Sequence, residues 1–196
     1  NKMNINIVPS TFVKKSFETI QFDVVDDKTK QKKGELKSEK PIEVLFEGTD
    51  TNIFKKTNEF SKQLVDEMKN VEESFNFLYV GHWLQGNLGK DRKDTGMMLK
   101  VFLESFKNQK HKPGIIMKTS GAGFSILDSQ EMLNKIESIK QTVKGDLPNV
   151  YLLHGDFTDG EMNELYNHPK VKAHINLTHG EGFGRPLLEA SISQKP

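Results

Sequence analysis

The chain has 196 residues, 35% of them hydrophobic, and its 28 basic and 27 acidic residues leave a formal net charge of +1. This length suffices for one domain with a sizeable core, or for one domain and part of another. So small a net charge attracts neither nucleic acid nor an acidic membrane, and no apolar run reaches the ~20 residues that cross a bilayer. Without cysteine the chain has no disulfides and no thiolate metal site. No signal peptide opens it, so a cytoplasmic location is expected.

The first part of the chain predicts two short strands and one helix. Residues 5–8 form a short apolar run, and Ser10 is placed to cap an amphipathic helix over residues 11–17. Residues 23–40 are rich in lysine and have no hydrophobic period, so we expect a linker or an exposed loop there. Residues 42–46 are apolar enough for a second strand.

From residue 59 onward the pattern predicts helices and strands in alternation. The expected helices cover residues 59–72, 95–108, 129–144 (with Ser129 as its cap) and 159–167, and a last one starts near Pro186; the expected strands cover 75–80, 114–118, 150–153 and 171–177. Helices between strands force crossover connections, so the sheet should be mostly parallel and covered on both faces. The predicted fold class is α/β, a doubly wound sheet whose ligands bind beyond the carboxyl ends of its strands.

The most informative stretch follows the last expected strand, where residues 178–190 read T-H-G-E-G-F-G-R-P-L-L-E-A. A strand, a glycine turn and a helix aim backbone N–H groups and the positive end of a helix dipole at an anion. Glu181 would lie in the turn and Glu189 about one turn into the helix, where both can accept hydrogen bonds from hydroxyls. That chemistry suits a sugar nucleotide. The alternative is a turn whose glycines only let the helix pack closely, with Glu189 solvated.

This stretch resembles the Glu, seven residues, Glu motif of retaining glycosyltransferases with the GT-B fold (group 1 family). In that family the pattern runs E-G-F-G-x-P-x-x-E-A, which the chain matches at Glu181, Gly182, Phe183, Gly184, Pro186, Glu189 and Ala190. Nearly the whole chain resembles the hinge and the Rossmann-like C-terminal domain, which binds the donor. Residues 8–12, V-P-S-T-F, resemble the end of the acceptor domain, and residues 42–50 the start of the donor domain.

The resemblance implies a division into residues 1–40, the end of the acceptor domain with its linker, and residues 41–196, an incomplete donor-binding domain. The chain begins without methionine and stops directly after a helix, so we expect a fragment of a longer polypeptide with a sheet truncated at the C-terminus. Such a fragment should be inactive alone, because the site of a two-domain enzyme forms between its halves. A truncated sheet exposes an edge, so the oligomeric state stays open.

The resemblance also implies roles for individual residues. Glu181 would contact the transferred sugar near its anomeric centre, and Glu189 would accept hydrogen bonds from the ribose hydroxyls. Backbone donors to sugar and phosphate would come from Gly182, Phe183, Gly184, Leu187 and Leu188, and Gly81 and His82 would approach the donor from the loop after their strand.

Three cations are candidates for the diphosphate, which gains negative charge as its bond to the sugar breaks. The resemblance points to Arg92 and Lys93, before an expected helix, and to Lys118, at the end of an expected strand, because relatives carry basic residues at these places. Glu181, Lys118 and Lys93 are thus the candidate catalytic residues; the alternative is that these lysines are ordinary solvated ones. Arg185 occupies a variable place in the family and is assigned no role.

Other ligand sites fail on inspection. The six histidines make no zinc pattern, and no metal or cofactor is expected beyond the nucleotide-sugar donor. Gly121 and Gly123 have Ile126 where a dinucleotide fingerprint needs a third glycine, and Asp91 after Gly89-Lys90 excludes a P-loop.

The function expected from these residues is sugar transfer, with retention, from a nucleoside diphosphate sugar to an unspecified glycan, lipid or small molecule. Neither nucleic acid nor an integral membrane segment is expected to take part. Two alternatives stay open. One is a non-catalytic binding module on a decayed GT-B domain, and the other is a sugar-nucleotide epimerase or phosphorylase with the same fold.

Overall fold

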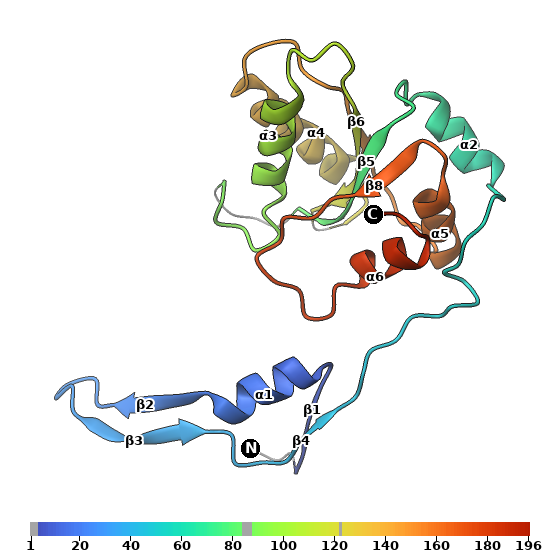
Figure 1. Cartoon of the computed structure of the whole chain (residues 1–196). Helices are drawn as coiled ribbons and strands as arrows, with labels where there is room; N and C mark the ends of the chain where they lie inside the picture. The colour runs from blue at the N-terminus through green and yellow to red at the C-terminus, as the bar shows by residue number, and fades with distance from the viewer. Residues whose placement is uncertain (1–3, 84–87, 122) are drawn as a thin grey trace. The chain divides into compact units, whose positions relative to one another are not determined.

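A computed structural model describes residues 4–83, 88–121 and 123–196 (Figure 1). The chain divides into two compact units, Asn1–Gly48 and Thr49–Pro196. The division predicted from the family resemblance lies between residues 40 and 41 and stays a prediction. The first compact unit includes β4 (Ile42–Val44), because this strand pairs in parallel with β1 (Asn6–Val8).

The N-terminal unit also contains the predicted helix, α1 (Thr11–Thr19). Ser10 caps it as expected, since its hydroxyl accepts a hydrogen bond from the Val13 N–H at 3.2 Å.

The linker or loop expected over residues 23–40 is wrong: most of this segment is a β-hairpin. Strands β2 (Gln21–Val25) and β3 (Lys32–Lys37) are antiparallel, with Phe22 opposite Leu36. On the other face of the hairpin, Lys32 binds Asp23 at 2.7 Å and Glu35 at 2.6 Å. Opposite charges on neighbouring strands stabilise such a pairing, so the lysines that favoured a loop are part of the hairpin.

The C-terminal unit is built on a four-stranded sheet in the order β7-β6-β5-β8 (Figure 1). Its strands are β5 (Asn76–His82), β6 (Gly114–Ser120), β7 (Val150–Leu153) and β8 (Val171–His174), and every pairing is parallel. The chain leaves β5 toward β6 and β7 and returns to its other side as β8. This makes the β5–β8 border the topological switch point, where ligands bind in sheets of this kind.

Helices cover both faces of the sheet, as alternation along the strands requires. Leu78 and Ile116 face a core with α2 (Lys62–Lys69), α5 (Asp159–Asn167) and α6 (Arg185–Ile192). Tyr79, Ile115 and Met117 face a second core with α3 (Thr95–Phe106) and α4 (Ile126–Gln141). The predicted fold class, an α/β doubly wound parallel sheet, is confirmed.

Several predicted boundaries need correction: α2 covers Lys62–Lys69 and not residues 59–72, and α4 ends at Gln141 and not at residue 144. Helix α4 starts at Ile126 and is capped by Ser125, whose hydroxyl accepts from the Asp128 N–H at 3.1 Å, so Ser129 is not the cap. Strand β8 ends at His174, three residues before the end predicted. In the residues that the structure describes, no helix is long and apolar enough to cross a membrane.

Candidate functional site

A cavity of about 240 Å³ lies at the carboxyl ends of β5 and β6. Four residues predicted for the site line it: Gly81 and His82 from β5, Lys118 from β6, and Lys93 from the segment before α3. Pro186, in the first turn of α6, also lines it. Figure 1 shows the β8–α6 connection on this side of the unit and the α3–β6 turn on the opposite side. The fold therefore gathers residues from four separate segments at the expected edge of the sheet.

Lys118 lies at this edge half-buried among aromatic side chains. Its ammonium donates to the Gly155 carbonyl at 2.7 Å and lies 4.5 Å from the ring centroid of Phe157 and 5.5 Å from that of Phe124. Burial lowers the pKa of Lys118, while the charge of Asp156 acts in the opposite direction. An ammonium has three donors, and aromatic faces favour its charge without accepting hydrogen bonds as a carboxylate does. Lys118 is thus suited to bind an anion.

Arg92 and Lys93 meet Glu181, although 88 residues separate Lys93 from it. The Lys93 ammonium lies 2.5 Å from Glu181 Oε1, and Arg92 Nη1 lies 3.5 Å from Oε2. Burial would raise the pKa of Glu181, but the hydrogen bond and charge of Lys93 and the charge of Arg92 lower it overall. Lys93 and Arg92 thus share one carboxylate, and Lys93 also lines the cavity.

Backbone contacts hold the two segments of this cluster together. The Arg92 carbonyl accepts from the His179 N–H at 2.9 Å and from the Thr178 hydroxyl at 3.0 Å. In return, Arg92 Nη1 donates to the Gly180 carbonyl at 2.6 Å. The turn that carries Glu181 is therefore attached directly to the segment that carries the cations.

The turn into α6 needs glycine at one position above all. Gly184 has φ of +82°, in the left-handed region that other residues rarely adopt, and it precedes the first residue of the helix. The N–H groups of Leu187 and Leu188 both donate to the Gly184 carbonyl, at 2.9 and 3.2 Å. These are the two groups predicted to donate to phosphate, and in the structure they belong to the first turn of α6. A Cβ built on Gly182 meets nothing within 4 Å.

Gly81 is required by close packing. A Cβ at this position would lie 2.8 Å from the Tyr79 hydroxyl oxygen and 3.1 Å from its ring. That hydroxyl is held in place by Thr95, 2.7 Å away at the start of α3. His82, the next residue, is 3.2 Å from the Ser120 hydroxyl, so the ends of β5 and β6 are joined by side chains as well as by the sheet.

Glu189 is buried, with 5% of its surface exposed, and both of its oxygens have protein donors. Arg185 Nε donates to Oε1 at 2.5 Å, and the Tyr166 hydroxyl donates to Oε2 at 3.0 Å. Burial raises the pKa of Glu189, against the lowering effect of the two donors. The alternative of a solvated Glu189 is therefore wrong.

Arg185 is a residue of this region to which the sequence assigned nothing. Besides Glu189 it binds Asp159, from Nη2 to Oδ1 at 2.8 Å, and its guanidinium lies 5.7 Å from the Phe54 ring centroid. The spacing of four residues between Arg185 and Glu189 on one helix is the signal that could have identified the pair. Asp159, in the first turn of α5, could not be connected with it from spacing alone.

A second unforeseen pair joins His154 and Asp128, whose Nε2 and Oδ2 atoms are 2.7 Å apart and largely buried. Asp128 also accepts from the Gly121 N–H at 3.1 Å, so the pair supports the loop after β6. Within the described parts of the chain, no group of three or more histidine, aspartate or glutamate side chains could hold a metal ion.

Comparison with known proteins gives little beyond the fold. No family model matches the chain, and no curated protein matches it. Among solved structures, it is similar to the C-terminal domain of a glycosyl transferase group 1 family protein from Francisella tularensis. The two share 14% sequence identity over 76% of this chain and 68% of that chain, with a TM-score of 0.49.

Proposed function

We propose that the C-terminal unit binds the nucleoside diphosphate part of a sugar donor and that the protein belongs to a glycosyltransferase of the retaining GT-B type. The observation that carries this proposal is the arrangement of Lys118, Lys93 and Arg92 with Glu181 at the carboxyl edge of a doubly wound sheet. Convergent cations beside a cavity at the carboxyl edge of such a sheet are what a diphosphate requires.

Each cation has a defined task in this proposal. Lys118 and Lys93, which both line the cavity, bind the diphosphate, and Arg92, which lies beside the same glutamate as Lys93, adds its charge. As the bond between sugar and phosphate breaks, the leaving diphosphate gains negative charge, and cations already in position stabilise it without reorganisation. Burial lowers the pKa of Lys118, and a phosphate beside it would favour its charged form.

In this proposal the two glutamates bind the transferred sugar and the ribose. Glu181 is placed by Lys93 and Arg92 next to the diphosphate site, where its carboxylate is available to the transferred sugar. Glu189 lies on α6, eight positions further on, and accepts hydrogen bonds from the ribose hydroxyls. The acceptor would be a glycan, a lipid or a small molecule bound outside the C-terminal unit.

The proposal is tested by thermal unfolding of the chain with ADP, GDP, UDP, dTDP and CMP, each with and without EDTA. A ligand that binds only the folded state at ~100 times its Kd raises the free energy of unfolding by about 2.7 kcal/mol. Stabilisation by one of the diphosphates, unaffected by EDTA and clearly smaller in Lys118→Met, is the expected result. No stabilisation by any of them in a folded protein would contradict the proposal.

A non-catalytic binding module on the same fold is the second candidate. The observation that favours it is that Lys93 is paired with Glu181, and Arg185 with Glu189, without any ligand. Such a module would show no nucleotide-dependent stabilisation, so the same experiment separates the two candidates.

A further inference from the structure

Arg185 and Glu189 form an ion pair whose two members differ sharply in exposure. The Arg185 side chain is 52% exposed, whereas that of Glu189 is 6% exposed. The opposite side of the carboxylate is closed by the buried hydroxyl of Tyr166. Of the two members, Arg185 is therefore the one open to solvent, and both oxygens of the covered carboxylate already have donors.

The same guanidinium has a second anchor. Its Nη2 binds Asp159, which lies in the first turn of α5 and is itself 50% exposed. The face of Arg185 also lies over the Phe54 ring. When the bond to Glu189 breaks, Arg185 keeps a charged partner and an aromatic neighbour, so it is not left unpaired at the surface.

We propose that Arg185 is a latch: in the free protein it occupies the carboxylate that the ribose needs, and a nucleotide with both ribose hydroxyls displaces it onto Asp159. This inference rests on the proposed function, because it names what competes for Glu189. A site that must open before it binds has its affinity reduced by the fraction of molecules already open. Arg185 thus sets the affinity for ribonucleotides without contacting the phosphates.

If Arg185 is such a latch, its removal should raise the affinity for ribonucleotides alone. Arg185→Met keeps much of the side-chain length and loses the guanidinium. It should bind a ribonucleoside diphosphate about two- to fivefold more tightly, which is the fold-change that a half-exposed ion pair is worth. A 2′,3′-dideoxy diphosphate cannot use Glu189, so its affinity should not change.

The experiment titrates ADP, GDP and UDP, each beside its 2′,3′-dideoxy counterpart, into the wild-type chain and the variant by calorimetry. Lys112→Met is the matched control: it removes one positive charge from an ion pair with Asp146 at the amino ends of the strands. This control should bind all six probes as the wild type does. In Arg185→Met/Glu189→Gln, the gain for the ribonucleotide should disappear, because the freed acceptor is gone.

The outcomes separate the latch from the proposed function. A gain confined to the ribonucleotide supports the latch. If the wild type binds a diphosphate but Arg185→Met binds it equally or more weakly, or gains equally for the dideoxy form, the latch is overturned and the proposed function stands. If neither protein, both folded, binds any of the six probes, the proposed function and the latch both fail.

Discussion

The two edges of the β7-β6-β5-β8 sheet carry similar side chains and use them differently. At the amino edge, Lys170 donates to the backbone carbonyls of Met68 and Val71, and Asn76 donates to the carbonyls of Glu73 and Lys170. These groups join loops to strands. At the carboxyl edge, Lys118, Lys93 and Arg92 converge beside a cavity, and two of them pair with one glutamate.

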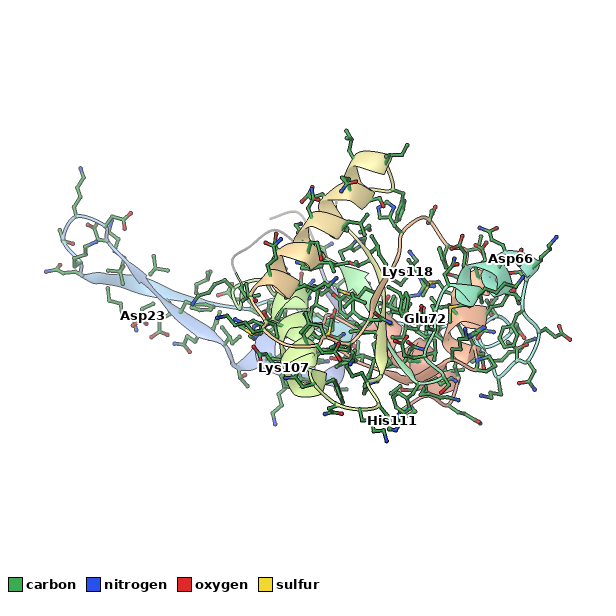
Figure 2. All side chains as sticks on the ribbon, turned by 90° about the horizontal axis from the view of Figure 1, so that it is seen from above. Asp23, Asp66, Glu72, Lys107, His111 and Lys118 are labelled. Atoms are coloured by element: carbon green, nitrogen blue, oxygen red, sulfur yellow. The ribbon has the colours of Figure 1, made fainter. Side chains whose placement is uncertain are left out.

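Volume alone would favour the amino edge as the binding site. The depression at the amino edge has about 600 Å³ against about 240 Å³ for the cavity at the carboxyl edge. Phe75, Phe77 and Phe106 line the larger one together with the turn that carries Lys110 and His111, and Figure 2 shows His111 at the margin of the unit. The comparison shows that the larger depression is not the one beside which cations converge, so the proposed site rests on convergent charge and not on size.

The largest expected effect is a loss of folding stability at acidic pH, caused by a histidine at the carboxyl edge. Burial lowers the pKa of His174, at the end of β8, to about 4. The unfolded chain binds this proton near pH 6.5, so between about pH 6.5 and 4 it binds more protons than the folded chain. Stability should therefore fall as the pH drops through this window, by about 3 kcal/mol at most. Urea denaturation at a series of pH values measures the slope.

His174→Phe isolates this effect. Among the described residues Nε2 of His174 is buried with no hydrogen-bond partner, so an aromatic ring without nitrogen should lose no bond there. The variant should have a flatter profile than the wild type, while His111→Phe at the amino edge should keep the wild-type slope. An unchanged slope in His174→Phe would assign the acid sensitivity to other groups.

The next effect compares one lysine from each edge. Lys118→Met should weaken nucleoside diphosphate binding by about 10- to 100-fold, the value of a hydrogen-bonded charge pair, with little loss of stability since burial already disfavours its charge. Lys170→Met should lower the free energy of unfolding by about 1–3 kcal/mol, because two carbonyls lose their donor, and leave affinity unchanged. Calorimetric titration and urea denaturation of both variants give the four values.

The pH dependence of nucleotide affinity also tests the role of Lys118. Because the pKa of Lys118 is lowered, wild-type affinity should decrease as the pH rises through that pKa, while Lys118→Met should show a weaker dependence. If the affinity of the two proteins depends equally on pH, Lys118 does not bind the anion.

A smaller effect tests the turn into α6. Gly184→Ala should cost about 1–2 kcal/mol of stability because its φ of +82° is strained for alanine. Gly182→Ala should change stability by no more than about 0.5 kcal/mol, since its Cβ enters open space. Thermal unfolding of the two variants measures both, and equal losses would contradict the special role given to Gly184.

The smallest expected effect belongs to the larger depression. Phe75→Ser alters its lining at a side chain that is 46% exposed and should leave nucleotide affinity unchanged. A measurable loss of affinity would indicate that the nucleotide binds at the amino edge and would contradict the difference drawn between the two edges.

The sequence predicted the order of helices and strands in the C-terminal unit because the apolar periods there are strong. Met98, Leu99 and Phe102 recur at helical spacing and are all buried. The start of α4 was missed because Ile126 and Leu127, 89% and 82% exposed, do not follow the period, which left Ser129 as the apparent cap. The hairpin was missed because its lysines were weighed as composition, although Lys32 pairs with carboxylates across the strands.

The candidate site was predictable only in part. Lys118 and Lys93 were predicted from the family resemblance. The contact between Lys93 and Glu181 joins segments that lie 88 residues apart in the sequence. The pairing of Arg185 with both Glu189 and Asp159 joins two helices, and no single period along the chain encodes it. Tertiary contacts of this kind become visible only when the fold is known.

The most direct test of the central claim is hydrogen exchange of the chain with and without the nucleoside diphosphate that stabilises it. The account predicts slower exchange in residues 117–121 and 180–189, at the carboxyl edge, with residues 73–77 and 106–113 unchanged. Slower exchange at the amino edge alone, or at neither edge in a protein that binds the nucleotide, would contradict it.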